Sequence, residues 1–153
     1  MSDASTPSEG YALITGASRG IGRAIALALA REGFAIIANY RHNEEAAESL
    51  KAEVEASGGT LRLCPFDVAD AEASQAALEA LIAEGLAIDV IVNNAGVIAD
   101  APFPGLKRQA WVDVTRTTLD GFYNVTQPLV MPMVRRRRGG RIINISSISG
   151  TLG

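Results

Sequence analysis

Five short apolar runs alternate along the chain with longer segments whose apolar residues recur at helical spacing. Each run is apolar on both faces, which is typical of strands in a parallel sheet that helices bury from two sides. We therefore predict five strands. They are YALIT at 11–15, FAIIANY at 34–40, LRLCP at 61–65, IDVIVN at 88–93 and RIINIS at 141–146.

The intervening segments predict helices, three of which end at glycines. Residues 106–136 predict one long helix or two in sequence, with a bend because Gly121, Pro128 and Pro132 interrupt the pattern. The first of the three shorter helices should bury Ile21, Ala24, Ile25, Ala28 and Leu29 and end at Gly33. The second should bury Ala47, Leu50 and Val54 and end at Gly58–Gly59. The third should bury Ala77, Leu78, Leu81 and Ile82 and end at Gly85.

The alternation of strands and helices predicts an α/β fold with a Rossmann-type doubly wound parallel sheet, five strands in the order 3-2-1-4-5, and helices on both faces. Ligands of such sheets bind beyond the carboxyl ends of the strands. Two helices on each face leave the fourth and fifth strands without cover on the first face, and the fifth strand as an open edge. We therefore expect 11–153 to be the N-terminal part of a longer domain, preceded by a disordered tail at 1–10.

Composition narrows the function classes. The net charge of −3 gives no sign of a nucleic-acid partner. One cysteine and one histidine exclude a disulfide framework and argue against a metal site, and we expect Cys64 to be a buried strand residue and His42 a solvated residue at a helix start. No apolar run approaches the roughly 18 residues that span a bilayer, and the polar start resembles no signal peptide. We expect a soluble cytoplasmic protein.

A glycine-rich turn, TGASRGIG at 15–22, follows the first strand and opens the first helix. Gly16 should permit the tight turn, Gly20 should let the backbone approach a phosphate, and Gly22 should let the helix pack closely. The helix N-terminus offers unpaired N–H groups to an anion. The alternative is a small-residue turn without a ligand, and the register of strand, turn and helix favours phosphate binding.

Three motifs together resemble the short-chain dehydrogenase/reductase family. TGASRGIG follows the first strand, NNAG at 93–96 the fourth, and NISSISG at 144–150 the fifth. The resemblance covers essentially all of 11–153 and implies a nicotinamide cofactor. The residues that it implies for binding in the two N-terminal motifs are Gly16, Ser18, Arg19, Gly20, Ile21, Gly22, Asn94, Ala95 and Gly96.

The choice of nicotinamide depends on the end of the second strand. NAD-binding folds place an acidic residue there for the ribose 2′-OH. Tyr40 fills that place, Arg41 follows, and Arg19 lies in the glycine turn, so two guanidinium groups favour the 2′-phosphate of NADP(H). The alternative for each arginine is a solvated surface residue. The resemblance also implies that Asp67 and Val68 meet the adenine, although Asp67 equally suits a helix cap or turn.

The resemblance implies hydride transfer to a carbonyl, with a tyrosine passing the proton. By motif match Ser147 is the serine that orients the substrate, unless it only caps its own loop. The family's YxxxK pair should lie about a dozen residues past this serine, beyond Gly153, so we expect the chain as given to be inactive. The run TTLDG places Thr118 where the family has an asparagine that holds a relay water, which puts the proton path in doubt.

Within the family, 3-oxoacyl-(acyl-carrier-protein) reductases resemble SRGIGRAIALALA and DGFYNVTQPLVMPM. This implies an acyl-carrier-protein-linked or small-molecule substrate and a homo-oligomer, dimer or tetramer. Arg135–Arg138 suit either docking of an acidic carrier protein or a helix C-terminus. Trp111, Phe122 and Tyr123 are expected in the core or a subunit contact. The alternatives are a reductase of another carbonyl compound and an NADP(H)-binding module without chemistry.

Overall fold

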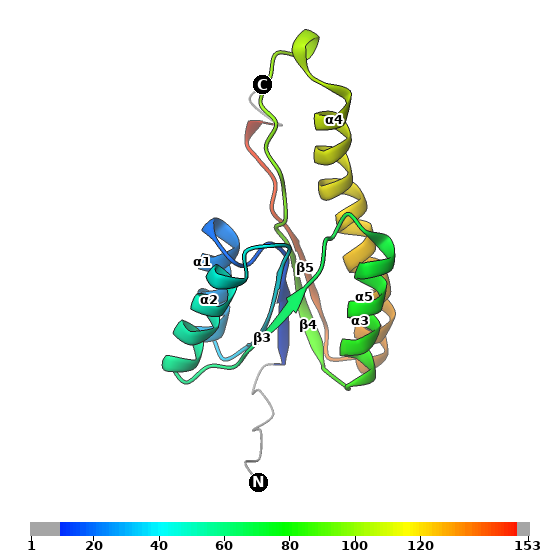
Figure 1. Ribbon diagram of the computed structural model, residues 1–153. Coiled ribbons are helices and arrows are strands. Elements are labelled where there is room, and N and C mark those ends of the chain that lie inside the picture. Colours follow the sequence, from blue (N-terminus) through cyan, green and yellow to red (C-terminus); the bar gives the residue numbers. More distant parts are fainter. Residues whose placement is uncertain (1–9, 150–153) are drawn as a thin grey trace.

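All five strands run parallel, in the order β3-β2-β1-β4-β5, as the sequence predicted. The computed structural model describes residues 10–149 (Figure 1). The strands are β1 (Tyr11–Ile14), β2 (Ala35–Tyr40), β3 (Leu61–Pro65), β4 (Ile88–Asn93) and β5 (Arg141–Asn144).

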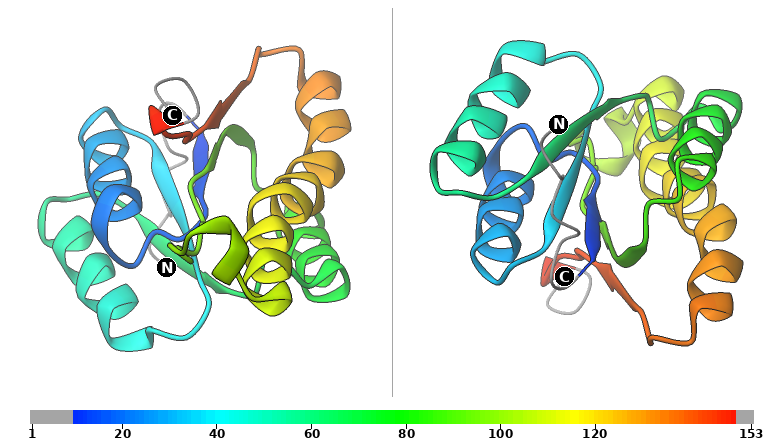
Figure 2. Two further views of the ribbon diagram at one scale, coloured as in Figure 1. Left: turned by 90° about the horizontal axis from the view of Figure 1, so that it is seen from above. Right: turned by 90° about the horizontal axis from the view of Figure 1, so that it is seen from below.

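The helices form a layer on each side of the sheet (Figures 1 and 2). Helices α1 and α2 lie on one side, and α3 and α5 lie on the other, while α4 extends beyond the sheet. Their bounds are α1 (Gly20–Arg31), α2 (Glu44–Ala56), α3 (Ala71–Ala83), α4 (Arg108–Thr115) and α5 (Gly121–Arg136), with a 3₁₀ turn η1 (Phe103–Gly105) and a π-helical turn η2 (Arg116–Asp120).

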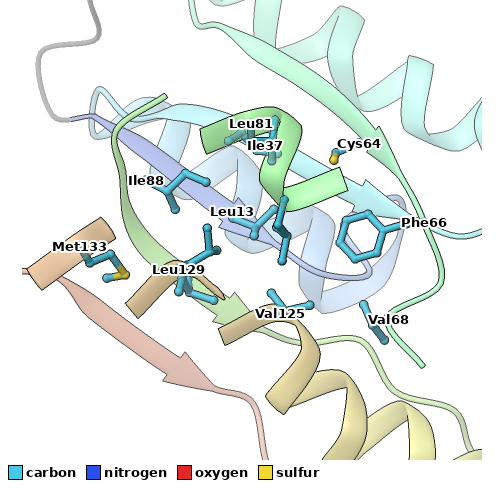
Figure 3. Close-up of a cluster of buried hydrophobic side chains, with 12 residues drawn as sticks. Leu13, Ile37, Cys64, Phe66, Val68, Leu81, Ile88, Val125, Leu129 and Met133 are labelled. Carbon is cyan, nitrogen blue, oxygen red and sulfur yellow. The ribbon is translucent and has the colours of Figure 1, made fainter. Parts of the chain in front are cut away.

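Successive residues of β1, β2 and β4 pack into opposite layers, as the pleat of a buried parallel sheet requires. Leu13 of β1 packs with the side chains of α3 and α5, in the cluster drawn in Figure 3. Its neighbours Ala12 and Ile14 pack on the other side, with residues of α1 and α2. Both apolar layers are therefore anchored on the same short strand, and the carboxyl ends of the strands are held together from both faces.

Two helices begin at side-chain caps. Asn43 accepts a hydrogen bond from the Ala46 N–H at the start of α2, and Asp70 accepts one from the Ala73 N–H at the start of α3. The buried residues of α2 are Ala47, Leu50 and Val54, as predicted. In α3 the buried apolar residues are Leu78 and Leu81, with Ala77 and Ile82 partly buried against the core, so this predicted face is also confirmed.

The predicted face of the first helix is right for Ile25 and Leu29, which are partly buried against the core, and wrong for its other three residues. Ile21, Ala24 and Ala28 are exposed, whereas Gly22 and Ala26 are the buried residues of α1. The sequence GIGRAIALALAR is small or apolar almost all the way round, so its periodicity does not select one stripe. The helix instead turns its smallest residues toward the sheet, which lets the two backbones approach closely.

The prediction that the fourth strand lacks cover on the first face is also wrong. Val90 and Val92 are buried in the same cluster as Ala17 and Ala26, so the glycine turn and α1 reach far enough to cover β4. The prediction for the fifth strand is confirmed. All four residues of β5 are exposed, and no strand within residues 10–149 pairs with its outer edge.

The long C-terminal helical segment consists of two helices in sequence. They meet at η2, where the Gly121 N–H donates to the Arg116 carbonyl, five residues back, in place of the usual four. The irregularity therefore precedes Gly121, and Pro128 and Pro132 lie inside α5. Trp111, Phe122 and Tyr123 are exposed by 51%, 40% and 63%, so the core alternative is wrong, and a subunit contact stays a prediction. The π turn shifts the helical register between Trp111 and the other two residues.

The N-terminal tail predicted at 1–10 falls, apart from Gly10, outside the described residues. Gly10 is buried, has φ +88°, and its carbonyl accepts a hydrogen bond from the Ala35 N–H at 3.0 Å. The fold thus includes Gly10, one residue before the predicted start. Within residues 10–149, no helix is both long and apolar enough to cross a membrane, and no group of three His, Cys, Asp or Glu residues could hold a metal.

Candidate cofactor site

The glycine-rich turn has the conformation that its sequence predicts. Gly16 and Gly20 have φ of +63° and +55°, in the left-handed region that favours glycine. A Cβ on Gly22 would lie 2.3 Å from the Gly16 carbonyl oxygen, so only glycine fits there. A Cβ on Gly20 would meet nothing within 4 Å. The turn is therefore closed on its inner side and open where a phosphate would approach.

Hydrogen bonding separates the amides of this turn into two groups. The N–H groups of Gly16 and Ala17 are already used, because they donate to the side-chain and backbone oxygens of Asn39 at 3.3 and 2.9 Å. The first bond internal to α1 is from the Arg23 N–H to the Arg19 carbonyl. The amides from Gly20 to Gly22 thus have no partner within the helix. With no acidic residue in its first turn, the helix offers these amides and its positive dipole end to an anion.

Asn39 is a residue of the site that the sequence interpretation missed. Its side chain is 2% exposed, and its amide donates to the carbonyls of Cys64 and Phe66 at 3.2 and 3.0 Å while its oxygen accepts the Gly16 N–H. A polar residue inside an otherwise apolar strand, FAIIANY, was the available signal. Asn39 joins the glycine turn, the end of β2 and the end of β3.

Thr15 and Asn94 join the turn to β4. The Thr15 hydroxyl oxygen accepts the N–H groups of Asn94 and Ala95 at 3.0 and 2.9 Å. The Asn94 side chain in return donates to the carbonyls of Thr15 and Gly16 at 2.9 and 3.2 Å. Asn94 and Ala95 are thus in contact with the glycine turn, whereas Gly96 is exposed.

The preceding residue, Asn93, faces the other way, toward β5. Its amide donates to the Thr126 hydroxyl at 3.0 Å and to the Asn144 side chain at 2.9 Å, and its backbone carbonyl accepts the Ile145 N–H. Its side-chain oxygen is buried and has no partner among the described residues. The two asparagines of NNAG therefore hydrogen-bond different segments. Asn94 is hydrogen-bonded to the glycine turn, and Asn93 to the segment that leads to Ser147.

The end of β2 carries the residues expected to choose the nicotinamide. Tyr40 is buried, and burial, followed by the charges of Glu44 and Glu48, raises the pKa of its phenol. Arg41 is 57% exposed, and its Nε lies 3.0 Å from Oδ2 of Asp67. Arg19 is exposed in the glycine turn. Both arginines are exposed, the Arg41 guanidinium is paired with a carboxylate, and their role in choosing the nicotinamide stays a prediction.

Asp67 and Val68 form the loop between β3 and α3. Oδ1 of Asp67 accepts the Ala69 N–H at 2.9 Å, so the turn alternative considered for this residue is present, while Asp70 caps the helix. The Val68 side chain is buried beside Gly121, and its carbonyl accepts a hydrogen bond from the Asn124 amide at 2.9 Å. The loop is thus fixed from both the sheet and α5.

Ser147 and Thr118 lie on exposed segments. The Ser147 hydroxyl oxygen accepts the Ser149 N–H at 3.1 Å, which is the local loop bond considered as its alternative role. Thr118 lies in η2, and no hydrogen bond of its hydroxyl joins it to a described residue. No hydrogen bond joins Ser147 to Thr118 among residues 10–149.

Two hollows of the molecule lie away from the glycine turn. Their volumes are about 220 and 400 Å³, and one lies between Ile82 and Arg136 and the other between Val130 and Ile142. The candidate site is defined by its hydrogen-bond donors and by the glycine turn.

Sequence and structure comparisons place this arrangement among known proteins. A family model described as short chain dehydrogenase matches residues 10–153. The chain is 46% identical over 141 residues to a 3-oxoacyl-(acyl-carrier-protein) reductase of Aggregatibacter actinomycetemcomitans, covering 92% of this chain and 58% of that protein. It is 43% identical over 139 residues to an acetoacetyl-CoA reductase of Paracoccus denitrificans, covering 91% of this chain and 55% of that protein.

Solved structures agree. A gluconate 5-dehydrogenase from Burkholderia cenocepacia in complex with NADP and tartrate superposes with a TM-score of 0.86 at 40% identity, over 94% of this chain and 56% of that one. The chain thus spans somewhat more than half the length of these relatives. Because the match to the family model extends over nearly the whole chain, this protein belongs to the short chain dehydrogenase family.

Proposed function

We propose that residues 11–153 form an NADP(H)-binding domain that serves the reduction of 3-oxoacyl thioesters linked to an acyl-carrier protein. The observation that carries the proposal is the turn from Gly16 to Gly22, with its unpaired amides and its open side at Gly20. The cationic side chain of Arg41 at the adjoining strand end extends the same site toward a 2′-phosphate.

Each chemical group of NADP(H) can be assigned to a particular set of residues. The amides of Gly20, Ile21 and Gly22, with the Ser18 and Arg19 backbone before them, suit the pyrophosphate. Arg41 and Arg19 suit the 2′-phosphate, and Tyr40, the last residue of β2, directly precedes Arg41. Asp67 and Val68 suit the adenine. The segment Asn94–Gly96 suits the part of the cofactor that leads toward the nicotinamide.

NADP(H), when bound, supplies the hydride. The hydroxyl of Ser147 would donate a hydrogen bond to the carbonyl oxygen that accepts this hydride, and so would orient the substrate. Asn93 holds the strand that precedes Ser147 through Asn144 and the Ile145 N–H. The Thr118 hydroxyl, in the π turn, can donate one hydrogen bond and accept others at the same oxygen, whereas an asparagine amide has two N–H donors and a separate acceptor oxygen.

The substrate class follows from the relatives that are named for it, which reduce a 3-oxoacyl group on a carrier protein or an acetoacetyl group on coenzyme A. Arg135, Arg137 and Arg138 complement an acidic carrier protein through long-range attraction. Arg136 is engaged otherwise, because its guanidinium lies 3.0 Å from the Asp89 carboxylate. We propose a homo-oligomer in the cytoplasm, as part of the same hypothesis.

The test is NADPH oxidation, followed at 340 nm, with an acetoacetyl thioester. The 153-residue chain and the complete reading frame of its gene are assayed side by side. Turnover by the complete product supports the reductase, and Ser147→Ala in that product should then lower kcat. Oxidation of NADPH with another ketone or aldehyde, but not with the thioester, would assign a different substrate to the same site.

A second candidate is an NADP(H)-binding module that carries out no chemistry. Thr118, in place of the family's asparagine, favours it. Retained NADPH binding by the complete gene product, together with no turnover of any carbonyl substrate, would support this candidate against the reductase.

A further inference from the structure

The ion pair between Arg41 and Asp67 joins two loops that the cofactor would touch at different points. Arg41 follows β2, and Asp67 lies in the loop after β3. Nε of Arg41 is 3.0 Å from Oδ2 of Asp67, and this is the ion pair that the described residues give to Arg41. The inner nitrogen of the guanidinium is the atom in contact with the carboxylate, and no guanidinium nitrogen of Arg41 makes a hydrogen bond to residues 10–149, so the contact is one of charge.

The two partners differ in how firmly they are held. The Asp67 carboxylate is fixed by its second oxygen, which accepts the Ala69 N–H at 2.9 Å. Its backbone carbonyl also accepts the Asp70 N–H at 3.0 Å, and the neighbouring Phe66 N–H donates to the Tyr40 carbonyl at 3.1 Å. Arg41, by contrast, is a long side chain that is 57% exposed. The Asp67 carboxylate is thus held in place by its own loop, and it can fix the position of the more exposed Arg41 side chain.

From this geometry we infer that Asp67 is a positioning residue for 2′-phosphate recognition, acting through Arg41. The carboxylate holds Nε so that the terminal nitrogens of the fork are presented together to the phosphate, in the bidentate manner that suits guanidinium and phosphate. The inference rests on the proposed function, and it adds a role in cofactor selectivity to a residue otherwise expected only to meet the adenine.

The negative charge of Asp67 also has an effect on phosphate binding that opposes the positioning of Arg41, and the test must separate the two effects. The Asp67 carboxylate also repels a phosphate directly, so removing its charge has one unfavourable and one favourable consequence. Only the positioning effect requires Arg41. The effect of Asp67→Asn must therefore be compared in the presence and absence of the arginine, as in a double-mutant cycle.

Two fragments of the cofactor make this comparison. Adenosine 2′,5′-bisphosphate and adenosine 5′-monophosphate share the adenine, the ribose and the 5′-phosphate, and differ only in the 2′-phosphate. A lost adenine contact weakens both, so the ratio of their dissociation constants isolates the 2′-phosphate. Both are titrated into the 153-residue chain by NMR, as wild type, Asp67→Asn, Arg41→Ala and the double variant. The Asp67→Asn side chain keeps an oxygen that can accept the Ala69 N–H, so the turn is retained.

We expect Asp67→Asn to lower the preference for the bisphosphate about two- to fivefold when Arg41 is present, the range of a partly exposed ion pair. When Arg41→Ala is already in place, the same change should leave the preference unchanged or raise it slightly. Asp70→Asn is the matched control, because it removes a charge from the same loop, retains a good helix cap and has no contact with Arg41. It should leave the ratio as in the wild type.

An equal effect of Asp67→Asn with and without Arg41, or a rise in preference when Arg41 is present, would overturn the positioning role. So would an equal effect of Asp70→Asn. If Arg41→Ala itself leaves the ratio unchanged, the assignment of Arg41 to the 2′-phosphate fails, and the inference fails with it. If Arg41→Ala lowers the ratio while Asp67→Asn does not, the proposed cofactor stands and the inference alone is wrong.

Discussion

Thr15 and Asn94 are linked by hydrogen bonds in both directions across the ends of two neighbouring strands. The Asn94 N–H donates to the Thr15 hydroxyl at 3.0 Å, and the Asn94 side chain donates to the Thr15 carbonyl at 2.9 Å. The same hydroxyl accepts the Ala95 N–H. Because β1 and β4 are adjacent in the sheet, this link ties the glycine turn to the NNAG motif and fixes the position of both.

The first prediction concerns the Thr15 hydroxyl. Thr15→Val has nearly the same shape but leaves the two N–H groups of Asn94 and Ala95 without an acceptor. We expect it to lower the free energy of unfolding by about 1–3 kcal/mol, the usual cost of an unsatisfied buried polar group. Urea denaturation followed by circular dichroism measures this. Thr15→Ser keeps the acceptor and should lose less than half as much. Equal losses in the two variants would show that the methyl group, not the hydroxyl, matters.

The second prediction concerns Gly22. Gly22→Ala would place a Cβ 2.3 Å from the Gly16 carbonyl oxygen and 2.5 Å from the Asn94 side chain, so the turn must open. We expect adenosine 2′,5′-bisphosphate binding to weaken about tenfold or more, because the unpaired amides lose their common direction. Gly105→Ala is the control, since its Cβ would meet nothing within 4 Å. Calorimetric titration that finds wild-type affinity in Gly22→Ala would contradict the assignment of this turn to phosphate.

The third prediction concerns Gly121, which allows Val68 to pack against α5. A Cβ on Gly121 would lie 2.8 Å from Cγ2 of Val68. We expect Gly121→Ala to lower the free energy of unfolding by about 1–3 kcal/mol through overpacking. Val68→Ala should cost a similar amount through a cavity. The double variant should be more stable than the sum of the two losses predicts, because the new methyl group occupies the vacated space. Additive losses, measured by urea denaturation, would count against this contact.

The fourth prediction concerns the pH dependence of stability. Burial, partly offset by Arg62, raises the pKa of the Cys64 thiol to about 11 from its usual value near 9. The folded state thus keeps the thiol protonated where the unfolded state loses the proton. The stabilisation is complete below pH 9 and is lost as the pH rises toward 11. The free energy of unfolding should therefore fall more steeply between pH 9 and 11 in the wild type than in Cys64→Ala. Parallel pH profiles of the two proteins would refute the shifted pKa.

The strands were predictable because their signal is local. Buried parallel strands are short apolar runs, and glycine turns and capped helices delimit them, so the sheet and its order followed from sequence alone. Helix α1 was harder. Nearly every residue of its sequence is small or apolar, and its buried side was settled by the close approach of Gly22 to Gly16, a contact between backbones that no periodicity records.

The site was predictable where it depends on motifs, and incompletely predictable where it depends on contacts between distant residues. The glycine turn and Arg41 were visible in the sequence. Asn39 was not recognised, because its three side-chain hydrogen bonds join segments that are 23 to 27 residues apart. The division of roles between Asn93 and Asn94 likewise depends on which strands lie on either side of β4, which the motif itself does not show.

The last prediction concerns the choice between NADPH and NADH. Arg41→Asp replaces a cation at the end of β2 by a carboxylate, which would repel a 2′-phosphate and can accept a hydrogen bond from a ribose 2′-OH. We expect the ratio of the two dissociation constants, measured by the fluorescence of the reduced nicotinamide, to shift toward NADH by about tenfold or more. Arg31→Asp, an equal change of charge in the last turn of α1, is the control and should leave the ratio unaltered. Because Asp67 then lies beside a second carboxylate, the affinity for both cofactors can fall, and the ratio is the decisive quantity. An unchanged ratio would place the 2′-phosphate, and with it the basis of selectivity, away from Arg41.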